Sequence, residues 1–117
     1  MSERAHMIMP SHPVLDRYEE EARGDDRLGT TFRGVGPASS DKVRRIGFRV
    51  GDLGRLRFLE TKLNFAPPLK NAVLERLHGA TPFAVGAILE EFTGYAARLG
   101  PYIRDPFPLV QGALARS

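Results

Sequence analysis

Apolar residues recur at helical spacing in at least four stretches of this chain, whereas no stretch has the pattern of a buried strand. Stripes run through 14–22, 53–63, 69–77 and 88–99, each with apolar side chains three or four residues apart. This spacing places them on one face of a helix. The pattern therefore predicts a mostly α fold of four to five helices.

Glycine, proline and capping residues predict where some of these helices begin and end. Ser11 and Pro13 are expected at the start of the first helix and Gly24 at its end. Ser40 is expected to cap a short helix over 41–46, so the segment from about Gly24 to Ser40 is expected to be irregular. Thr81-Pro82 is expected to begin the longest helix, and Gly79 to end the one before it.

The glycine-rich segment "GTTFRGVGPASSDKVRR", which spans 29–45, has the chemistry of an anion site. Its glycines permit positive φ, and successive backbone N–H groups in such turns can surround an anion. The basic residues that follow it can bind phosphate, arginine through two parallel bonds. The alternative is a glycine-rich linker beside a solvated basic helix. The segment lacks the P-loop pattern GxxxxGK[ST], and no strand precedes it as a dinucleotide site requires.

Charge and composition exclude several classes of protein. The net charge of +3 suits an anionic ligand but is too small to indicate a nucleic-acid partner. No apolar run approaches the roughly 20 residues of a membrane span. The chain has no cysteine, and His6, His12 and His78 form no metal-binding pair, so no metal site and no catalytic group are predicted. The acidic run 19–21 is expected to be a solvated helix face.

The stretch 27–53, "RLGTTFRGVGPASSDKVRRIGFRVGDL", resembles the central signature of the adenylosuccinate synthetase family. The flanks "SERAHMIMPSHPVLDRYEEEARG" and "ILEEFTGYAARLGPYIRD" also resemble that family, so the similarity spans nearly the whole chain. It implies that residues 1–117 are a partial domain, with a loop for the phosphate of IMP over about 24–52 and a helical segment over 53–117. The fold implied is the helical sub-region of a larger α/β, P-loop-like synthetase domain.

The resemblance also implies roles for individual residues. Thr31 matches a threonine that contacts the IMP phosphate, and Arg45 an arginine that reaches across a homodimer to the IMP of the other subunit. Lys42 and Arg49 match basic residues near the site.

Three positions depart from the family's usual pattern. Phe32 stands where glycine is common, Ser39 where tyrosine is usual, and Ile46 where a second arginine follows the first.

The implied reaction is the GTP- and Mg²⁺-dependent ligation of IMP with L-aspartate in purine biosynthesis, carried out by a cytoplasmic enzyme. The resemblance places the catalytic and magnesium-binding parts upstream of the matched segment, and the guanine-recognition part downstream. The chain alone is therefore expected to be inactive and to hold neither GTP nor magnesium. The alternative is a non-catalytic helical module that dimerises or binds a nucleotide phosphate.

Overall fold

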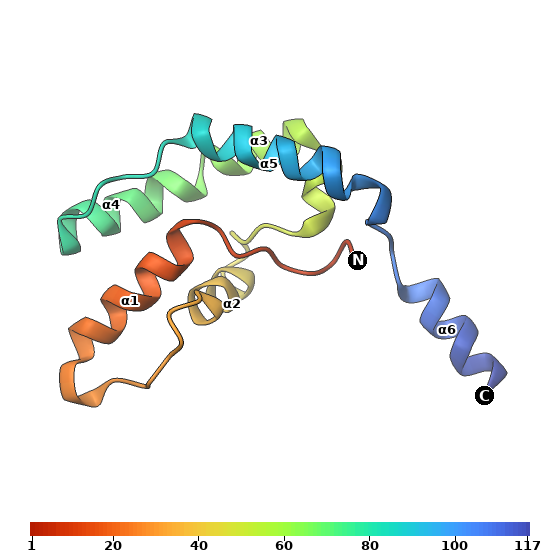
Figure 1. The fold of residues 1–117 in the computed structure, drawn as a ribbon, viewed down its shortest axis with the longest axis horizontal. Helices are drawn as coiled ribbons and strands as arrows, with labels where there is room; N and C mark the ends of the chain where they lie inside the picture. Colours follow the sequence, from red (N-terminus) through yellow and green to blue (C-terminus); the bar gives the residue numbers. More distant parts are fainter.

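The computed structural model describes residues 1–117 and contains six α-helices, three short 3-10 helices and no strand (Figure 1). The mostly helical fold predicted from the apolar stripes is confirmed, with six α-helices in place of four to five. The α-helices are α1 (Ser11–Arg23), α2 (Val35–Val43), α3 (Leu56–Leu63), α4 (Ala66–His78), α5 (Val85–Leu99) and α6 (Phe107–Arg116). The 3-10 helices are η1 (Gly24–Asp26), η2 (Val50–Gly54) and η3 (Gly100–Tyr102).

Two glycines end helices as the sequence predicts, but α5 begins later than predicted. Gly24 and Gly79 follow α1 and α4 with positive φ, a conformation that only glycine adopts at little cost. The longest helix begins at Val85 rather than at Thr81-Pro82. The reason is that Asn71 on α4 holds the backbone of Phe83 through two hydrogen bonds of 2.8 Å, which keeps this segment extended.

The glycine-rich segment is more helical than the sequence predicts. The expected irregular stretch is confirmed over 27–34 but does not reach Ser40, and the short helix over 41–46 is wrong, because α2 runs from Val35 to Val43. Gly34 precedes it with a φ of +81° and lies directly against α1. A Cβ at Gly34 would come within 2.7 Å of the Cβ of His12. Glycine therefore allows a close helix contact here, and the helix starts at that contact.

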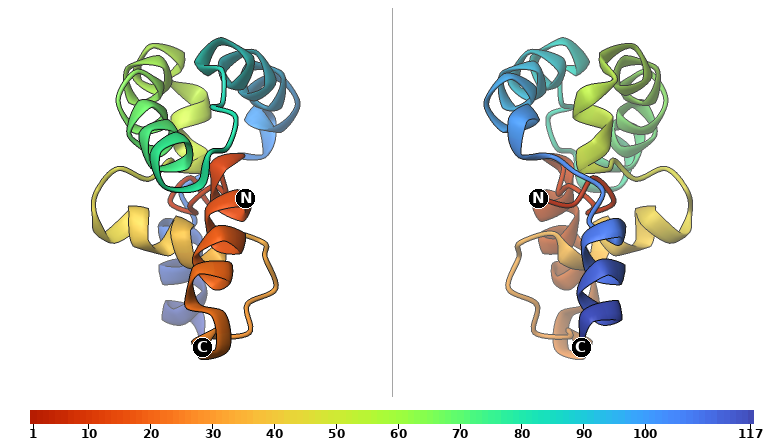
Figure 2. Two further views of the ribbon diagram at one scale, coloured as in Figure 1. Left: turned by 90° about the vertical axis from the view of Figure 1, so that its left-hand side faces the viewer. Right: turned by 90° about the vertical axis from the view of Figure 1, so that its right-hand side faces the viewer.

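The core lies on one side of the N-terminal segment. It joins the N-terminal segment, the chain after α2, η2, α3, α4 and α5 through eight buried side chains: Met9, Phe48, Leu53, Leu59, Leu63, Ala66, Ile88 and Phe92. Figure 2 shows α3, α4 and α5 on this side, with α1, α2 and α6 on the other. α1 packs against α2 and α4, largely through polar side chains.

The chain is extended for its length. Its radius of gyration is 16.5 Å, whereas a compact domain of this size has about 13 Å. Only 22 of the 117 residues are buried, and α6 contains none of them. This helix projects from the rest of the fold (Figure 1). No helix combines the length and the apolar character that crossing a bilayer requires.

Candidate anion-binding site

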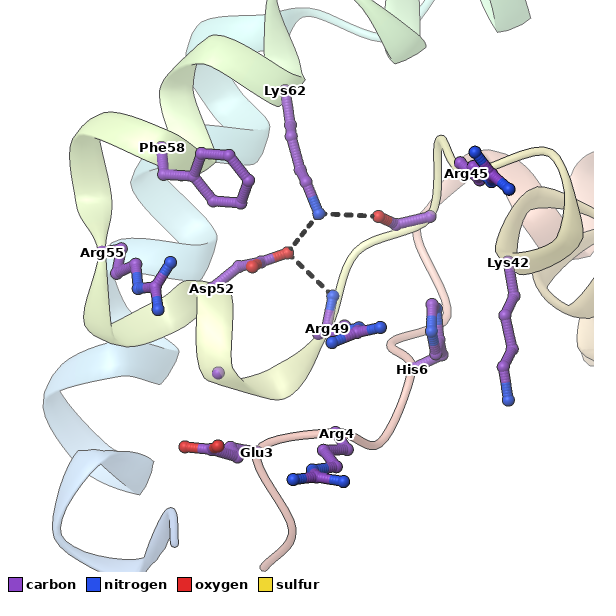
Figure 3. A pocket seen from close by; sticks show the side chains of 12 residues that line it. Glu3, Arg4, His6, Lys42, Arg45, Arg49, Asp52, Arg55, Phe58 and Lys62 are labelled. Atoms are coloured by element: carbon purple, nitrogen blue, oxygen red, sulfur yellow. Dashed lines mark hydrogen bonds and ion pairs between the residues drawn. The ribbon is translucent and has the colours of Figure 1, made fainter. Parts of the chain in front are cut away.

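A cleft of about 760 Å³ opens between the N-terminal segment, the chain that follows α2, and α3 (Figure 3). Its lining contains six lysines and arginines but only two carboxylates, so the cleft carries a net positive charge. The lining residues are Glu3, Arg4, His6, Lys42, Arg45, Gly47, Arg49, Gly51, Asp52, Arg55, Phe58 and Lys62.

Backbone pairing brings the N-terminal segment into the cleft. The N–H of Met7 donates to the carbonyl of Phe48 at 2.7 Å, and the N–H of Val50 donates to the carbonyl of Ala5 at 2.8 Å. These bonds place His6 opposite Arg49. Gly47 permits the close approach, since a Cβ there would lie 2.9 Å from Nδ1 of His6.

Arg45 lines the cleft from an unusual backbone conformation. It follows the last turn of α2 with a φ of +64°, which is uncommon for residues other than glycine. The N–H of Arg45 donates to the carbonyl of Lys42 at 3.1 Å, and the N–H of Ile46 donates to that of Asp41 at 3.0 Å. These two bonds form a Schellman motif, in which this position is usually glycine. A long charged side chain at a strained position suggests a functional role.

Some charges of the cleft are already used within the fold. Nζ of Lys62 donates to Oδ2 of Asp52 at 2.7 Å and to the carbonyl of Gly47 at 3.0 Å. Oδ2 of Asp52 also accepts from the N–H of Arg49 at 2.9 Å. By contrast, the side chains of Lys42, Arg45 and Arg49 form no ion pair. Their charges are available to an anion in the cleft.

A buried network fixes the end of α2 that carries Lys42 and Arg45. The N–H of Met9 donates to Nδ1 of His12 at 2.8 Å, so the proton of this ring is on Nε2. Nε2 then donates to Oδ2 of Asp41 at 2.7 Å, and Lys70 on α4 pairs with the other oxygen. Burial lowers the pKa of His12 despite the neighbouring carboxylate, which agrees with a neutral ring. α2 is thereby anchored to both α1 and α4.

The glycine-rich loop binds an anion that belongs to the chain itself. The side chain of Glu20 accepts hydrogen bonds from the N–H groups of Leu28 at 3.0 Å, Gly29 at 2.8 Å and Thr30 at 3.3 Å. The expectation of a solvated acidic face is wrong for Glu20, which is 3 % exposed. Its burial favours a higher pKa, but the backbone bonds and Arg23 outweigh this effect and lower the pKa.

The structure brings three of the four predicted site residues together. Lys42, Arg45 and Arg49 line the cleft, whereas Thr31 is exposed on the loop before α2 and does not. Arg44, the other member of the arginine pair, is exposed and lies outside the cleft. No three His, Asp or Glu side chains are placed to hold a metal ion.

Sequence patterns assigned no role to His6, which lines the cleft, and no local signal could have revealed one. Its position depends on backbone pairing with a segment more than 40 residues away. The two other histidines have structural contacts. His12 belongs to the buried network, and the ring of His78 stacks on that of Tyr18 at 4.5 Å between centroids.

The three positions that depart from the family's pattern have different environments. Phe32 has a φ of +58°, a conformation that glycine would adopt without strain. Ser39 is exposed, while Ile46 packs against the core.

Comparisons with known proteins agree on one family. The model of the family "Adenylosuccinate synthetase" matches residues 1–117. Among curated proteins, the adenylosuccinate synthetase of Gloeobacter violaceus is 45% identical over 114 residues, which are 97% of this chain and 26% of that protein. That of Dehalococcoides mccartyi strain BAV1 is 40% identical over 116 residues, which are 99% of this chain and 27% of that protein.

Comparison with solved structures identifies the same family. The structure of fully ligated adenylosuccinate synthetase from Plasmodium falciparum aligns with a TM-score of 0.80 and 26% sequence identity. The alignment covers 98% of this chain and 27% of that one. The chain therefore spans about a quarter of the length of the curated relatives that it matches.

Proposed function

This chain belongs to the adenylosuccinate synthetase family, and we propose that it forms the part of such an enzyme that binds the phosphate of IMP. The enzyme's reaction is the ligation of IMP with L-aspartate to give adenylosuccinate, driven by GTP in the presence of Mg²⁺. This reaction belongs to purine biosynthesis and takes place in the cytoplasm. The chain contributes binding groups to it rather than catalytic ones.

The observation that carries this proposal is the environment and backbone conformation of Arg45. Its guanidinium faces a cationic cleft, has no carboxylate partner, and is presented from a backbone conformation that costs free energy. A guanidinium binds phosphate through two parallel, charge-assisted hydrogen bonds. Lys42 and Arg49 add positive charge on either side, which suits a dianion better than a carboxylate.

The separate positions of Thr31 and Arg45 support a site shared between two chains. Thr31 lies outside the cleft that Arg45 lines. A single bound phosphate is then contacted by Thr31 of one subunit and by Arg45 of the other. The active assembly is therefore a homodimer, and each chain contributes to two IMP sites.

The residues of this chain do not fit the magnesium ion that the family reaction needs. Mg²⁺ prefers carboxylate oxygens in octahedral geometry, and no cluster of three acidic or histidine side chains is present. We therefore assign no step of the reaction to a metal held here. GTP and Mg²⁺ are bound by other parts of the family's enzymes, and the chain alone makes no adenylosuccinate.

Titration with IMP tests the binding role. Arg45→Ala is compared with Arg44→Ala, which removes the same charge from outside the cleft. We expect weak binding that strengthens with protein concentration, weakens with salt, and is lost only in Arg45→Ala. Equal binding by both variants would refute the role of Arg45. Binding that does not depend on protein concentration would refute the shared site, and would favour a nucleotide-phosphate module that acts as a monomer.

A further inference from the structure

We propose that His6 is a further anion-binding residue of the cleft, and that it takes up a proton when a dianion binds there. The ligand class is a tetrahedral dianion such as a phosphate monoester. This inference rests on the anion-binding function proposed above, to which it adds a dependence on pH. It is carried by the position of the ring, by its unpaired nitrogens and by the charges around it.

The imidazole of His6 has hydrogen-bonding capacity that the fold does not use. Its Nδ1 is buried against Gly47 and has no hydrogen-bond partner. Its Nε2 also has no partner, but it is not buried and the ring lines the cleft (Figure 3). Nε2 is therefore the nitrogen that meets a ligand. Other buried polar side-chain atoms are satisfied, so the unpaired ring stands out against a well-bonded fold.

Charged side chains from several elements around the cleft act on His6: Lys42 on α2, Arg49 in the segment that pairs with the N-terminal segment, Lys62 on α3 and Asp52 on η2. Glu3, Arg4, Arg45 and Arg55 also line the cleft. Burial and the three cations lower the pKa of His6, and the carboxylate of Asp52 offsets this only in part. Without an anion nearby, the imidazole of His6 is therefore neutral at pH 7.

A bound dianion raises the pKa of His6 again. Its negative charge offsets the repulsion from Lys42, Arg49 and Lys62 and favours the imidazolium form. The protonated ring then donates a charge-assisted hydrogen bond from Nε2 to an oxygen of the anion. Because binding raises the pKa of His6, it takes up a proton. By linkage, the affinity for the anion must rise as the pH falls, by at most about tenfold per pH unit for one proton.

Sulfate is a suitable probe, because it is a tetrahedral dianion that does not itself titrate between pH 6 and pH 8. Calorimetric titration of the chain at pH 8, 7 and 6, in buffers of different ionisation enthalpy, gives both the affinity and the number of protons taken up. We expect the affinity to rise about three- to tenfold per pH unit and proton uptake to accompany binding. In His6→Gln, which keeps a polar group but cannot titrate, the uptake should vanish and the affinity should change little with pH.

Two controls separate this inference from the function on which it rests. His78→Gln removes a histidine that stacks on Tyr18 outside the cleft, and should behave as the unaltered chain. Nuclear magnetic resonance of the unaltered chain should show the pKa of His6 rising when sulfate is added. Binding that requires Arg45 but has the same pH dependence in His6→Gln would overturn the role of His6 alone. Absence of sulfate binding would overturn the role of His6, whereas the IMP titration with Arg45→Ala decides the function on which it rests.

Discussion

Replacing Arg45 with glycine should stabilise the fold while it removes anion binding. The φ of +64° at Arg45 costs about 1–2 kcal/mol in a residue that has a Cβ. Glycine removes this cost but gives the unfolded chain about 0.4–1 kcal/mol of additional conformational entropy. The difference is a net stabilisation of about 0.5–1 kcal/mol. Arginine at position 45 therefore lowers the stability of the fold but places a positive charge in the cleft.

Thermal unfolding, followed by circular dichroism at the helix signal, measures this gain. A chain of 117 residues has an unfolding entropy of about 0.25 kcal/mol/K, at about 2.1 cal/mol/K per residue. The melting temperature of Arg45→Gly should therefore rise by about 2–4 °C. Arg45→Ala is the matched control, because it removes the same charge but keeps a Cβ at the left-handed position. Its melting temperature should stay below that of the glycine variant, and both should lose IMP binding.

A melting temperature of Arg45→Gly at or below that of Arg45→Ala would refute this reasoning. It would mean that the backbone at this position is not strained, so that strain could no longer be used as an argument for function. Retention of anion binding by both variants would instead leave the strain in place and remove its functional explanation.

Three further predictions concern the loop, the buried histidine and the second strained residue. Glu20→Gln should lower the free energy of unfolding by about 1–3 kcal/mol and speed hydrogen exchange over 28–30, because it weakens the acceptor of three backbone N–H groups; Glu21→Gln, on the same helix but exposed, should do neither. Stability in urea should fall as the pH drops below about 6.5, by up to about 1.4 kcal/mol per pH unit for each proton, because His12 is neutral in the fold and protonated once unfolded; His12→Gln should reduce this slope, and an unchanged slope would contradict the assignment. Phe32→Gly should raise the melting temperature, since Phe32 has a φ of +58° and is exposed, whereas a decrease would show that contacts of its ring matter more than its backbone.

The existence of most helices could be predicted from local sequence patterns. Their first residues were misplaced where contacts between distant parts of the chain determine the start of a helix. The apolar stripes identified α1, α3, α4 and α5, because each of these helices buries part of its stripe, although Leu69, Val73 and Leu77 of α4 are exposed. α2 starts six residues earlier than predicted, since its first turn depends on the fit of Gly34 against α1. α5 starts three residues later than Pro82, because the side chain of Asn71 holds Phe83 extended. Neither contact produces a periodic pattern in the amino-acid sequence.

The cleft was partly predictable. Three of its six basic residues, Lys42, Arg45 and Arg49, lie within one short segment, so composition indicated an anion site, and the resemblance singled out Arg45. The anion that occupies the N–H groups of the glycine-rich loop could not be predicted, because Glu20 has the same sequence context as its exposed neighbours. His6 reaches the cleft only through backbone pairing with a distant segment. The spacing of residues along the chain does not predict a contact between two segments so far apart in the sequence.

The exposed helix α6 has a consequence for how long this chain persists in a cell. Its side chains Phe107, Leu109, Val110 and Leu114 are all more than half exposed. Cellular quality control acts on chains with accessible apolar surface, and a chain with few buried residues has little stability with which to resist it. We therefore expect a chain whose α6 is covered to be degraded more slowly than one whose α6 is exposed.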